Sequence, residues 1–206
     1  MNENEEENSN EINNNIKIIL LGEMGTGKTN LISAYLGNKF EIFPATIAPK
    51  FSQKTVMINE QLYYIDIWDT MGHERYRSLT KNFIRGSHIV IFVYDITNRN
   101  SFDELEFWVN CVKEELSYEP VIGLVGNKID LFEQEKVSQK DGEDYAEKIG
   151  ALFEVTSAKE NPDGFKDFVK KLIEKLLSKQ NSVNITTDII SIKSSQIKKI
   201  EKKNCC

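Results

Sequence analysis

The chain has 206 residues, 40% of them hydrophobic, which suits one globular domain of about 170 residues with tails. Its formal net charge of −6 argues against general affinity for nucleic acid, so we expect no nucleic-acid partner. The sequence shows no secretory signal and no apolar run near the roughly 20 residues of a membrane span, and its three cysteines do not make a disulfide framework, so a reducing cytosolic setting is expected.

The two ends of the chain differ from its middle in composition. Residues 1–15 hold five Glu, seven Asn and no basic residue, a composition that cannot bury enough apolar surface to order itself. Residues 178–206 hold six Lys and two acidic residues, and they end in Cys205 and Cys206. We therefore expect a disordered acidic N-terminus over 1–15, a folded domain over 16–178 and a flexible basic tail over 179–206.

Short apolar runs that end at turn residues predict six strands, at 16–21, 51–58, 61–68, 88–94, 121–126 and 151–157. The pair Asn59-Glu60 predicts a hairpin between the second strand and the third. Helices are expected at 28–36, 101–116, 139–149 and from 162 onward. Because strands alternate with helices, the pattern predicts an α/β fold: a six-stranded, mostly parallel sheet flanked by helices on both faces.

Three of the helix starts carry capping signals. Ser101 with Glu104 and Ser138 with Asp141 have the spacing of a capping box. Asn161 stands directly before Pro162, which fits an N-cap followed by proline at the first helical position. The apolar residues after Pro162 recur at helical spacing, and we expect them to pack in the core.

Four loops follow strands and should share one rim of the sheet, where ligands bind in such folds: 22–29, 69–73, 126–130 and 156–159. The first reads GEMGTGKT, fits G-x-x-x-x-G-K-[ST], and lies between a strand and a helix. Backbone N–H groups of such a loop surround phosphates at a helix N-terminus. Lys28 is expected to reach the β- and γ-phosphates, and the Thr29 hydroxyl to bind Mg²⁺. The expected phosphate-binding residues are Gly22, Glu23, Met24, Gly25, Thr26, Gly27, Lys28, Thr29 and Asn30.

Two further loops are suited to a purine base. Residues 127–130 read NKID, and the Asp130 carboxylate can accept hydrogen bonds from guanine N1–H and its exocyclic amine, a donor pair that adenine lacks. Asn127 would brace the loops and touch the base, with Lys128 beside it. Residues 156–159 read TSAK, where the backbone amide of Ala158, between Ser157 and Lys159, can approach the guanine carbonyl.

The remaining candidate site residues surround the phosphates and the metal ion. Asp69 ends an apolar strand and fits the carboxylate that holds Mg²⁺ through water, and the Thr46 hydroxyl is placed to complete the metal shell. The Gly72 N–H is a candidate donor to the γ-phosphate. Phe40 is a candidate to lie against the base, with packing in the core as the alternative.

These motifs occur in an order that resembles a small GTPase of the Ras superfamily. The matching segments are the P-loop, DTMG (69–72), NKID and TSAK. Within that superfamily the chain looks like the Rab family, on IDIWDT (65–70), ERYRSLT (74–80) and FVYDITNRNSF (92–102). The resemblance covers about 16–178, and it implies a small G domain of the P-loop nucleotide hydrolases with GTP or GDP and Mg²⁺ as cofactors.

The resemblance also implies a molecular switch in vesicle traffic. GTP with Mg²⁺ would order two loops, about 38–50 and 69–81, and hydrolysis would release them. Phe51, Trp68 and Phe83 match the positions of the family's effector-binding aromatics, although plain packing is the alternative. The partners implied are effectors, an exchange factor, an activating protein, a GDP-dissociation inhibitor and the prenylation machinery.

Cys205-Cys206 resembles the tail that receives two geranylgeranyl groups in that family, which implies the cytoplasmic face of an intracellular membrane in exchange with the cytosol. The alternative is a solvated basic tail with two spare thiols. Nearby lysines would favour an anionic membrane surface.

The chain departs from the family pattern at the residues of hydrolysis. The family's D-T-A-G-Q-E is D-T-M-G-H-E here, so His73 stands where a glutamine positions the attacking water, while Lys28 keeps its catalytic place. Met24 is bulky where the family has a small residue, and Glu23 replaces the more usual Asp. We therefore expect slow hydrolysis. A GTP-bound scaffold that barely hydrolyses is the alternative, and an ATPase or nucleotide kinase is a third class that Asp130 argues against.

Overall fold

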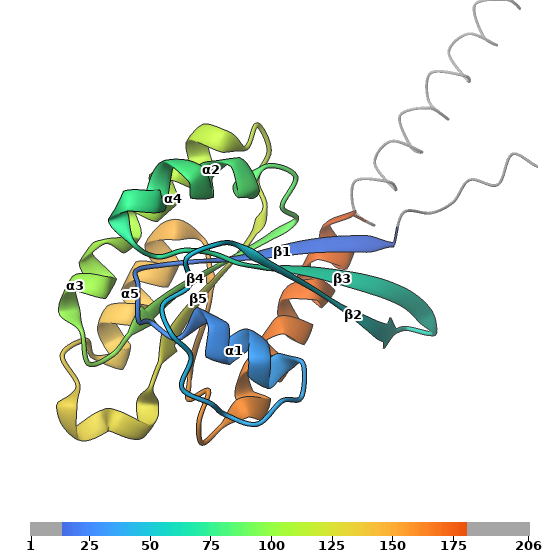
Figure 1. The fold of residues 1–206 in the computed structure, drawn as a ribbon. Coiled ribbons are helices and arrows are strands. Elements are labelled where there is room, and N and C mark those ends of the chain that lie inside the picture. Colours follow the sequence, from blue (N-terminus) through green and yellow to red (C-terminus); the bar gives the residue numbers. More distant parts are fainter. Residues whose placement is uncertain (1–13, 181–206) are drawn as a thin grey trace, which may run out of the picture.

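The structure is a computed structural model, and it describes residues 14–180. Six strands form one sheet in the order β2-β3-β1-β4-β5-β6 (Figure 1). Neighbouring strands pair in parallel except β2 with β3, which are antiparallel. This confirms the predicted α/β fold. The strands are β1 (Asn15–Leu21), β2 (Lys50–Ile58), β3 (Gln61–Asp69), β4 (Ile89–Asp95), β5 (Val121–Asn127) and β6 (Leu152–Thr156).

The hairpin between β2 and β3 forms at the predicted turn. Ile58 pairs with Gln61, so that Asn59 and Glu60 are the two turn residues. Both have a positive φ, 50° and 65°, which is the conformation that a two-residue hairpin turn of type I′ requires. The turn sets the register that places Phe51 opposite Trp68.

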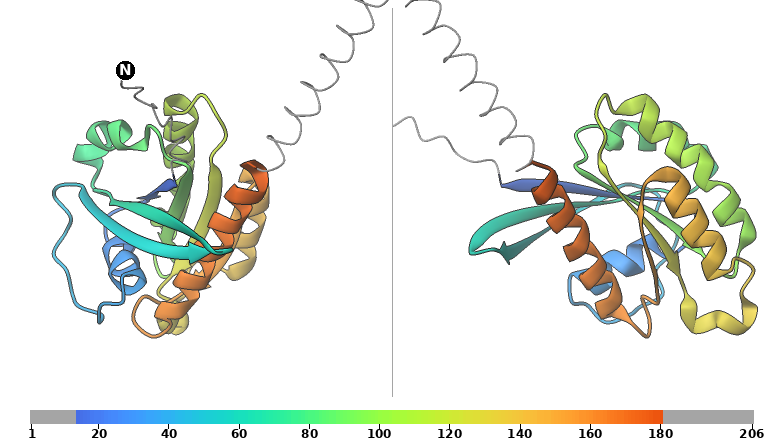
Figure 2. Two further views of the ribbon diagram at one scale, coloured as in Figure 1. Left: turned by 90° about the vertical axis from the view of Figure 1, so that its right-hand side faces the viewer. Right: turned by 180° about the vertical axis from the view of Figure 1, so that it is seen from behind.

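Helices cover both faces of the sheet (Figures 1 and 2). On one face, α1 and the helix over 162–180 pack through Leu31, Phe165 and Leu172 against β1, β3 and β4. On the other face, α2 to α5 pack against β1, β4 and β5, with Trp108 and Phe92 fully buried. The helices are α1 (Lys28–Tyr35), α2 (Arg77–Ile84), α3 (Arg99–Asp103), α4 (Leu105–Glu115) and α5 (Gln139–Ile149).

Two of the three predicted helix starts are confirmed. The Ser138 hydroxyl accepts from the Asp141 N–H and the Asp141 carboxylate accepts from the Ser138 N–H, which is a complete capping box. Asn161 Oδ1 accepts from the Gly164 N–H at 3.2 Å, as expected of an N-cap before Pro162.

The predicted capping box at Ser101 is wrong. Helix α3 already begins at Arg99, and Ser101 lies inside it. Its hydroxyl donates to the Asn98 carbonyl at 2.7 Å and accepts from the Asp95 N–H at 3.0 Å, so it fastens the end of β4 to the helix start. The predicted helix over 101–116 is therefore divided, with Glu104 at the junction of α3 and α4.

The second predicted switch loop, 69–81, contains helical structure. A short 3₁₀ helix, η1, spans Glu74–Tyr76, and α2 starts at Arg77. Thr80 and Ile84 on α2 are buried, and this packing substitutes for the missing side-chain cap at Tyr76. A second 3₁₀ helix, η2 (Ile129–Gln134), follows β5. The first predicted switch loop, 38–50, is irregular up to the start of β2.

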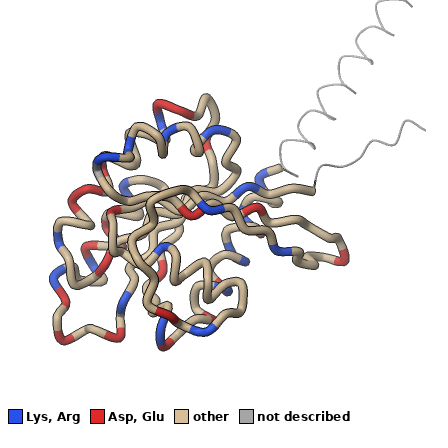
Figure 3. The backbone as a smooth tube through the Cα atoms, in the orientation of Figure 1, with Lys and Arg blue, Asp and Glu red and all other residues tan. Residues whose placement is uncertain are grey.

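Acidic and basic residues are interspersed along the described part of the chain (Figure 3). Among residues 14–180, no helix has the length and apolar character that crossing a membrane requires. Figure 1 shows that both ends of this part lie on the same side of the molecule, away from the carboxyl ends of the parallel strands.

Candidate functional site

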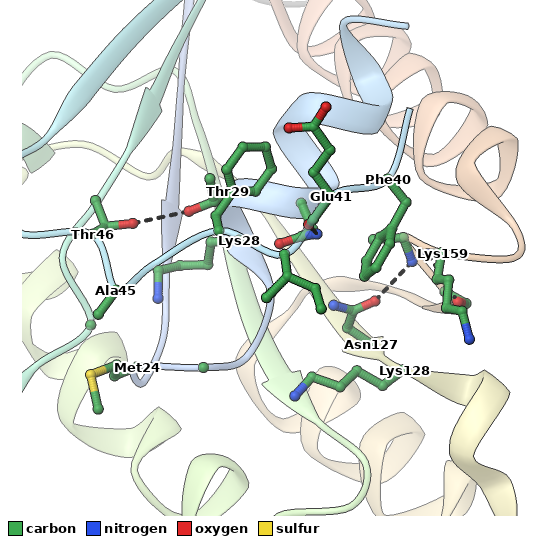
Figure 4. A pocket seen from close by; sticks show the side chains of 18 of the residues that line it. Met24, Lys28, Thr29, Phe40, Glu41, Ala45, Thr46, Asn127, Lys128 and Lys159 are labelled. Carbon is green, nitrogen blue, oxygen red and sulfur yellow. Dashed lines mark hydrogen bonds between the residues drawn. The ribbon is translucent and has the colours of Figure 1, made fainter. Parts of the chain in front are cut away.

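A cavity of about 640 Å³ opens at the carboxyl ends of the parallel strands. All four loops that the sequence places on this rim contribute to its lining, together with residues 40–46. Figure 4 shows two ends: Met24, Thr29 and Thr46 lie at one, while Phe40, Asn127 and Lys159 lie at the other. The residues predicted to bind the phosphates and the metal ion therefore lie at one end of the cavity, and those predicted to bind the base lie at the other.

The conformation of the P-loop depends on glycine at position 27. Gly27 has φ 93°, and a Cβ on it would lie 2.3 Å from Asn127 Nδ2, so this position needs glycine. The buried Lys28 ammonium donates to the carbonyls of Gly22 at 2.8 Å and Glu23 at 2.9 Å. Burial lowers the pKa of Lys28 to about 8, against the opposing charges of Asp69 and Glu23. A buried cation in a loop of this kind is an anion-binding group.

Three predicted metal-binding side chains converge beside the P-loop. The Thr29 hydroxyl donates to Asp69 Oδ2 at 2.7 Å and lies 3.0 Å from the Thr46 hydroxyl. Burial raises the pKa of the Asp69 carboxyl, opposed by the Thr29 hydrogen bond and by Lys28. Asp69 Oδ1 is buried without a hydrogen-bond partner among the residues that the structure describes. An unsatisfied carboxylate oxygen next to two hydroxyls is a set of hard oxygen donors, and it fits Mg²⁺.

At the other end of the cavity, Asn127 ties three loops together. Its Nδ2 donates to the Thr26 carbonyl at 2.8 Å, and its Oδ1 accepts from the Ala158 N–H at 3.2 Å. The Ser157 hydroxyl donates to Asp130 Oδ1 at 2.6 Å, which fixes the carboxylate that the sequence assigns to guanine. Lys128 has φ 70° and pairs with Asp95 at 2.6 Å. Asn127 thus has the bracing position that the sequence predicts.

Most of the predicted nucleotide-binding residues line the cavity. The ones that do so are Met24, Gly25, Gly27, Lys28, Thr29, Asn30, Phe40, Thr46, Gly72, Asn127, Lys128, Asp130, Ser157, Ala158 and Lys159. Four predicted residues do not line the cavity, but each forms a hydrogen bond with a residue that does: Gly22, Glu23, Thr26 and Asp69. The lining residues that the sequence did not single out are Glu41, Ile42, Phe43, Pro44, Ala45, Thr70 and Leu131. Most of these lie between Phe40 and Thr46. Because both of those residues were predicted to belong to the site, the segment between them could have been included in the prediction.

Gly72 lies directly on the P-loop. Its carbonyl accepts from the Met24 N–H at 3.1 Å. A Cβ at Gly72 would lie 2.4 Å from the Glu23 carbonyl carbon and from the Met24 nitrogen, so only glycine permits this approach. The Met24 side chain is 50% exposed and lines the cavity beside it.

His73 is half-buried and does not line the cavity. Its Nδ1 accepts from the Arg75 N–H at 3.3 Å, and its ring meets the Tyr76 ring edge to face at 6.0 Å between centroids. Met71, which stands where the family pattern has alanine, is 2% exposed, and its carbonyl accepts a hydrogen bond from the Thr80 hydroxyl. Met71 therefore fills core space.

The three aromatic residues assigned to effectors form one continuous group. The ring centroids of Phe51 and Trp68 are 5.4 Å apart, and those of Trp68 and Phe83 are 5.3 Å apart. Phe51 is 48% exposed, so this group reaches the surface at the junction of β2, β3 and α2. Cys205 and Cys206, predicted to carry lipid, lie outside the described residues.

The comparison with known families agrees with this site. The family model described as "Ras: Ras family" matches residues 17–178, which is well over half of the chain. The match includes the P-loop, both candidate switch segments and the two candidate base-binding loops. The chain therefore belongs to the Ras family of small GTPases, whose members bind guanine nucleotide with Mg²⁺ and act as GTP-dependent switches.

Proposed function

We propose that this Ras-family switch is of the Rab type, regulates vesicle traffic from the cytoplasmic face of an intracellular membrane, and hydrolyses GTP slowly. The observation that carries the Rab assignment is the continuous contact of Phe51, Trp68 and Phe83. Phe51 lies on β2 and Trp68 on β3, between the two switch segments, and Phe83 lies on α2. A movement of either switch segment would therefore change how the three rings pack together. Aromatic side chains of this kind are typical anchors of protein partners.

The nucleotide would lie along the cavity with its phosphates at the P-loop and its base against Phe40, Lys128 and Asp130. Lys28 would exchange its two carbonyl partners for phosphate oxygens, since charge-assisted hydrogen bonds to an anion are stronger. Asp130 would select guanine, held in place by Ser157.

Thr29, Thr46 and Asp69 would hold Mg²⁺, whose charge offsets that of the phosphates when it is bound. Because Thr46 belongs to the first switch loop and Thr29 to the P-loop, a metal ion between them would order that loop. The buried Asp69 Oδ1 without a described partner supports this assignment.

Slow hydrolysis is supported by the position of His73. A neutral histidine offers one donor and one acceptor, and here Nδ1 already accepts from the Arg75 N–H. A glutamine amide in this place offers a donor group and an acceptor oxygen on a flexible side chain, whereas the imidazole ring holds its two nitrogens in different positions. Met24, exposed in the cavity, adds bulk where a water or an arginine from an activating protein would approach.

The second candidate is a switch of the same fold that remains GTP-bound and acts as a scaffold. The same His73 and Met24 positions favour it, and both candidates bind GTP. The hydrolysis rate separates them: a scaffold shows none above the rate of GTP in water, with or without an activating protein.

The test of the Rab-type role is imaging and metabolic prenyl labelling of the tagged full chain in eukaryotic cells. We expect the wild type to incorporate label and to decorate internal membranes. The variant with Cys205→Ser and Cys206→Ser should lose both, because two lipid chains are needed for stable anchoring. Cys111→Ser, at a buried cysteine of α4, is the matched control and should retain both. Equal labelling and membrane location of the tail variant would overturn the proposal.

A further inference from the structure

Arg77, the first residue of α2, connects three separate elements by ion pairs. Its Nη2 lies 2.6 Å from Glu23 Oε1 in the P-loop and 2.9 Å from Glu104 Oε2 at the junction of α3 and α4. The side chains of Arg77 and Glu23 are only 22% and 14% exposed. A partly buried guanidinium shared by two carboxylates is a directional contact, unlike an isolated surface ion pair.

Aromatic rings complete the surroundings of this cation. The Arg77 guanidinium carbon lies 4.4 Å from the centroid of the Phe107 ring and 5.8 Å from that of Trp108. Trp108 is fully buried, and its Nε1 donates to Glu23 Oε1 at 3.3 Å. The Glu23 carboxylate is therefore held from two sides, by the cation of α2 and by the buried indole of α4.

Glu23 uses its backbone and its side chain for different purposes. Its carbonyl accepts from Lys28 Nζ inside the P-loop. Its side chain does not line the nucleotide cavity, and its carboxylate meets Arg77 and Trp108 instead. A change at Arg77 can therefore alter the position of α2 without changing a residue that lines the cavity.

A second contact ties the same segment to the next P-loop residue, since the Met24 N–H donates to the Gly72 carbonyl. Residues 72–77 are thus fastened at both ends to adjacent P-loop positions, 24 and 23. His73, the candidate water-positioning residue, lies between the two fastenings.

We propose that Arg77 is a positioning residue, which together with Glu23, Glu104 and Trp108 forms a latch that holds the second switch on the P-loop. In the structure the latch is closed while Thr46 and Asp69 contact Thr29, the combination that GTP with Mg²⁺ would favour. The latch stabilises that arrangement and so favours GTP over GDP. This inference rests on GTP-dependent ordering of the switches.

Because the contact and nucleotide binding are thermodynamically linked, the latch has a measurable effect on nucleotide affinity. A contact present only in the ordered form raises the affinity of the ligand that prefers that form, and it leaves unchanged the affinity of a ligand that binds both forms equally. Couplings of this kind typically change affinity by about fivefold or more. A merely structural role would weaken both nucleotides together.

The test measures the Kd of fluorescent GDP and of a fluorescent non-hydrolysable GTP analogue for the full chain and its Arg77→Gln variant. Gln removes the charge that Glu23 and Glu104 bind and leaves every P-loop residue unchanged. We expect the Kd of the GTP analogue to rise about fivefold while that of GDP stays within about twofold. Arg77→Lys keeps the charge and should lie closer to the wild type. The double variant with Glu104→Gln should be no worse than Arg77→Gln alone.

Glu114→Gln is the matched control, because it removes the Lys81–Glu114 pair between α2 and α4 without touching the P-loop. It should leave both Kd values unchanged. Equal shifts for the two nucleotides, or the same shift in Glu114→Gln, would overturn the latch.

Hydrogen exchange of the purified protein separates this proposal from the assignment of the ligand. Arg77→Gln should speed exchange of the amides in 72–80 and leave those of β4 and β5 unchanged. If the wild type bound neither nucleotide but the variant showed this faster exchange, the nucleotide assignment would fail, and the latch would stand as a contact that holds 72–80. Unchanged exchange in 72–80 would overturn the latch.

Discussion

The Thr29 hydroxyl donates to Asp69 Oδ2 at 2.7 Å, which joins the start of α1 to the end of β3. These residues are separated by 40 positions in the sequence, and the parallel pairing of β1 with β3 brings them together. Thr46, on a third segment, lies 3.0 Å from the same hydroxyl. The contact is therefore the point at which the P-loop and both switch segments meet.

Asp69→Asn tests the metal assignment. The amide keeps the size of the carboxylate and can still accept from Thr29, but it lacks the charge that holds a hydrated Mg²⁺. We expect about a 10- to 100-fold loss of Mg²⁺ affinity, measured as the Mg²⁺ concentration that half-restores slow release of fluorescent GDP after chelation. If Mg²⁺ slows release in the variant at wild-type concentrations, Asp69 is not part of the metal site.

Asp130→Asn tests the choice of base. The variant loses two hydrogen bonds to a charged acceptor, each worth about 1.5–3 kcal/mol, so GTP should bind about a hundredfold more weakly or worse. Xanthine carries an oxygen in place of the exocyclic amine, which the new amide can donate to, so xanthosine triphosphate should bind better to the variant than GTP. Asp163→Asn, whose side chain is 78% exposed, is the charge-matched control and should bind like the wild type. Unchanged preference for GTP in Asp130→Asn would remove Asp130 from the base site.

Lys28 predicts a pH dependence of binding. In the free protein its pKa is about 8, lowered by burial and opposed by Asp69 and Glu23, so the ammonium is charged at pH 7 and mostly neutral at pH 9. Phosphate binding favours the charged form, so affinity should be flat below pH 8 and fall above it. Calorimetry of GDP binding in two buffers of different ionisation enthalpy should show proton uptake at pH 9 and little at pH 7. The same uptake at both pH values would contradict the assignment.

Gly72→Ala tests the second fastening of the switch. The added methyl group would lie 2.4 Å from the Met24 nitrogen, so residue 72 must move off the P-loop. We expect the GTP analogue to bind at least about fivefold more weakly, with GDP affinity and melting temperature close to those of the wild type. Gly86→Ala, at an open positive-φ glycine after α2, controls for loss of glycine itself. If the Gly72→Ala variant still prefers the GTP analogue as the wild type does, contact of Gly72 with the P-loop is not part of the ordered form.

The fold and the end of the cavity formed by residues 127–130 and 156–159 were predictable because their signals are local. Asn59 tolerates the positive φ that the hairpin turn requires, and Ser138 caps a helix with a partner three residues away. NKID and TSAK each follow an apolar strand, so the sheet brings Asn127 and Ala158 to one rim.

The predictions that were wrong or missing concern places where a tertiary contact determines the local structure. Ser101 has the spacing of a cap, but its hydroxyl is used by Asp95 and Asn98 at the end of β4. Helix α2 lacks a capping side chain and forms because Thr80 and Ile84 are buried. The contact of Arg77 with Glu23 spans 54 positions, and the sequence alone gives no reason to join them.

The central claim is that this chain binds GTP as a switch and that His73 slows the step that turns it off. Single-turnover hydrolysis of GTP, measured side by side for the wild type and His73→Gln, tests it most directly. Nucleotide affinity should be equal, because His73 does not line the cavity. We predict that His73→Gln hydrolyses about ten- to a hundredfold faster, which corresponds to about 1–3 kcal/mol of barrier. A wild type at least as fast as His73→Gln, with and without an activating protein, would contradict the account.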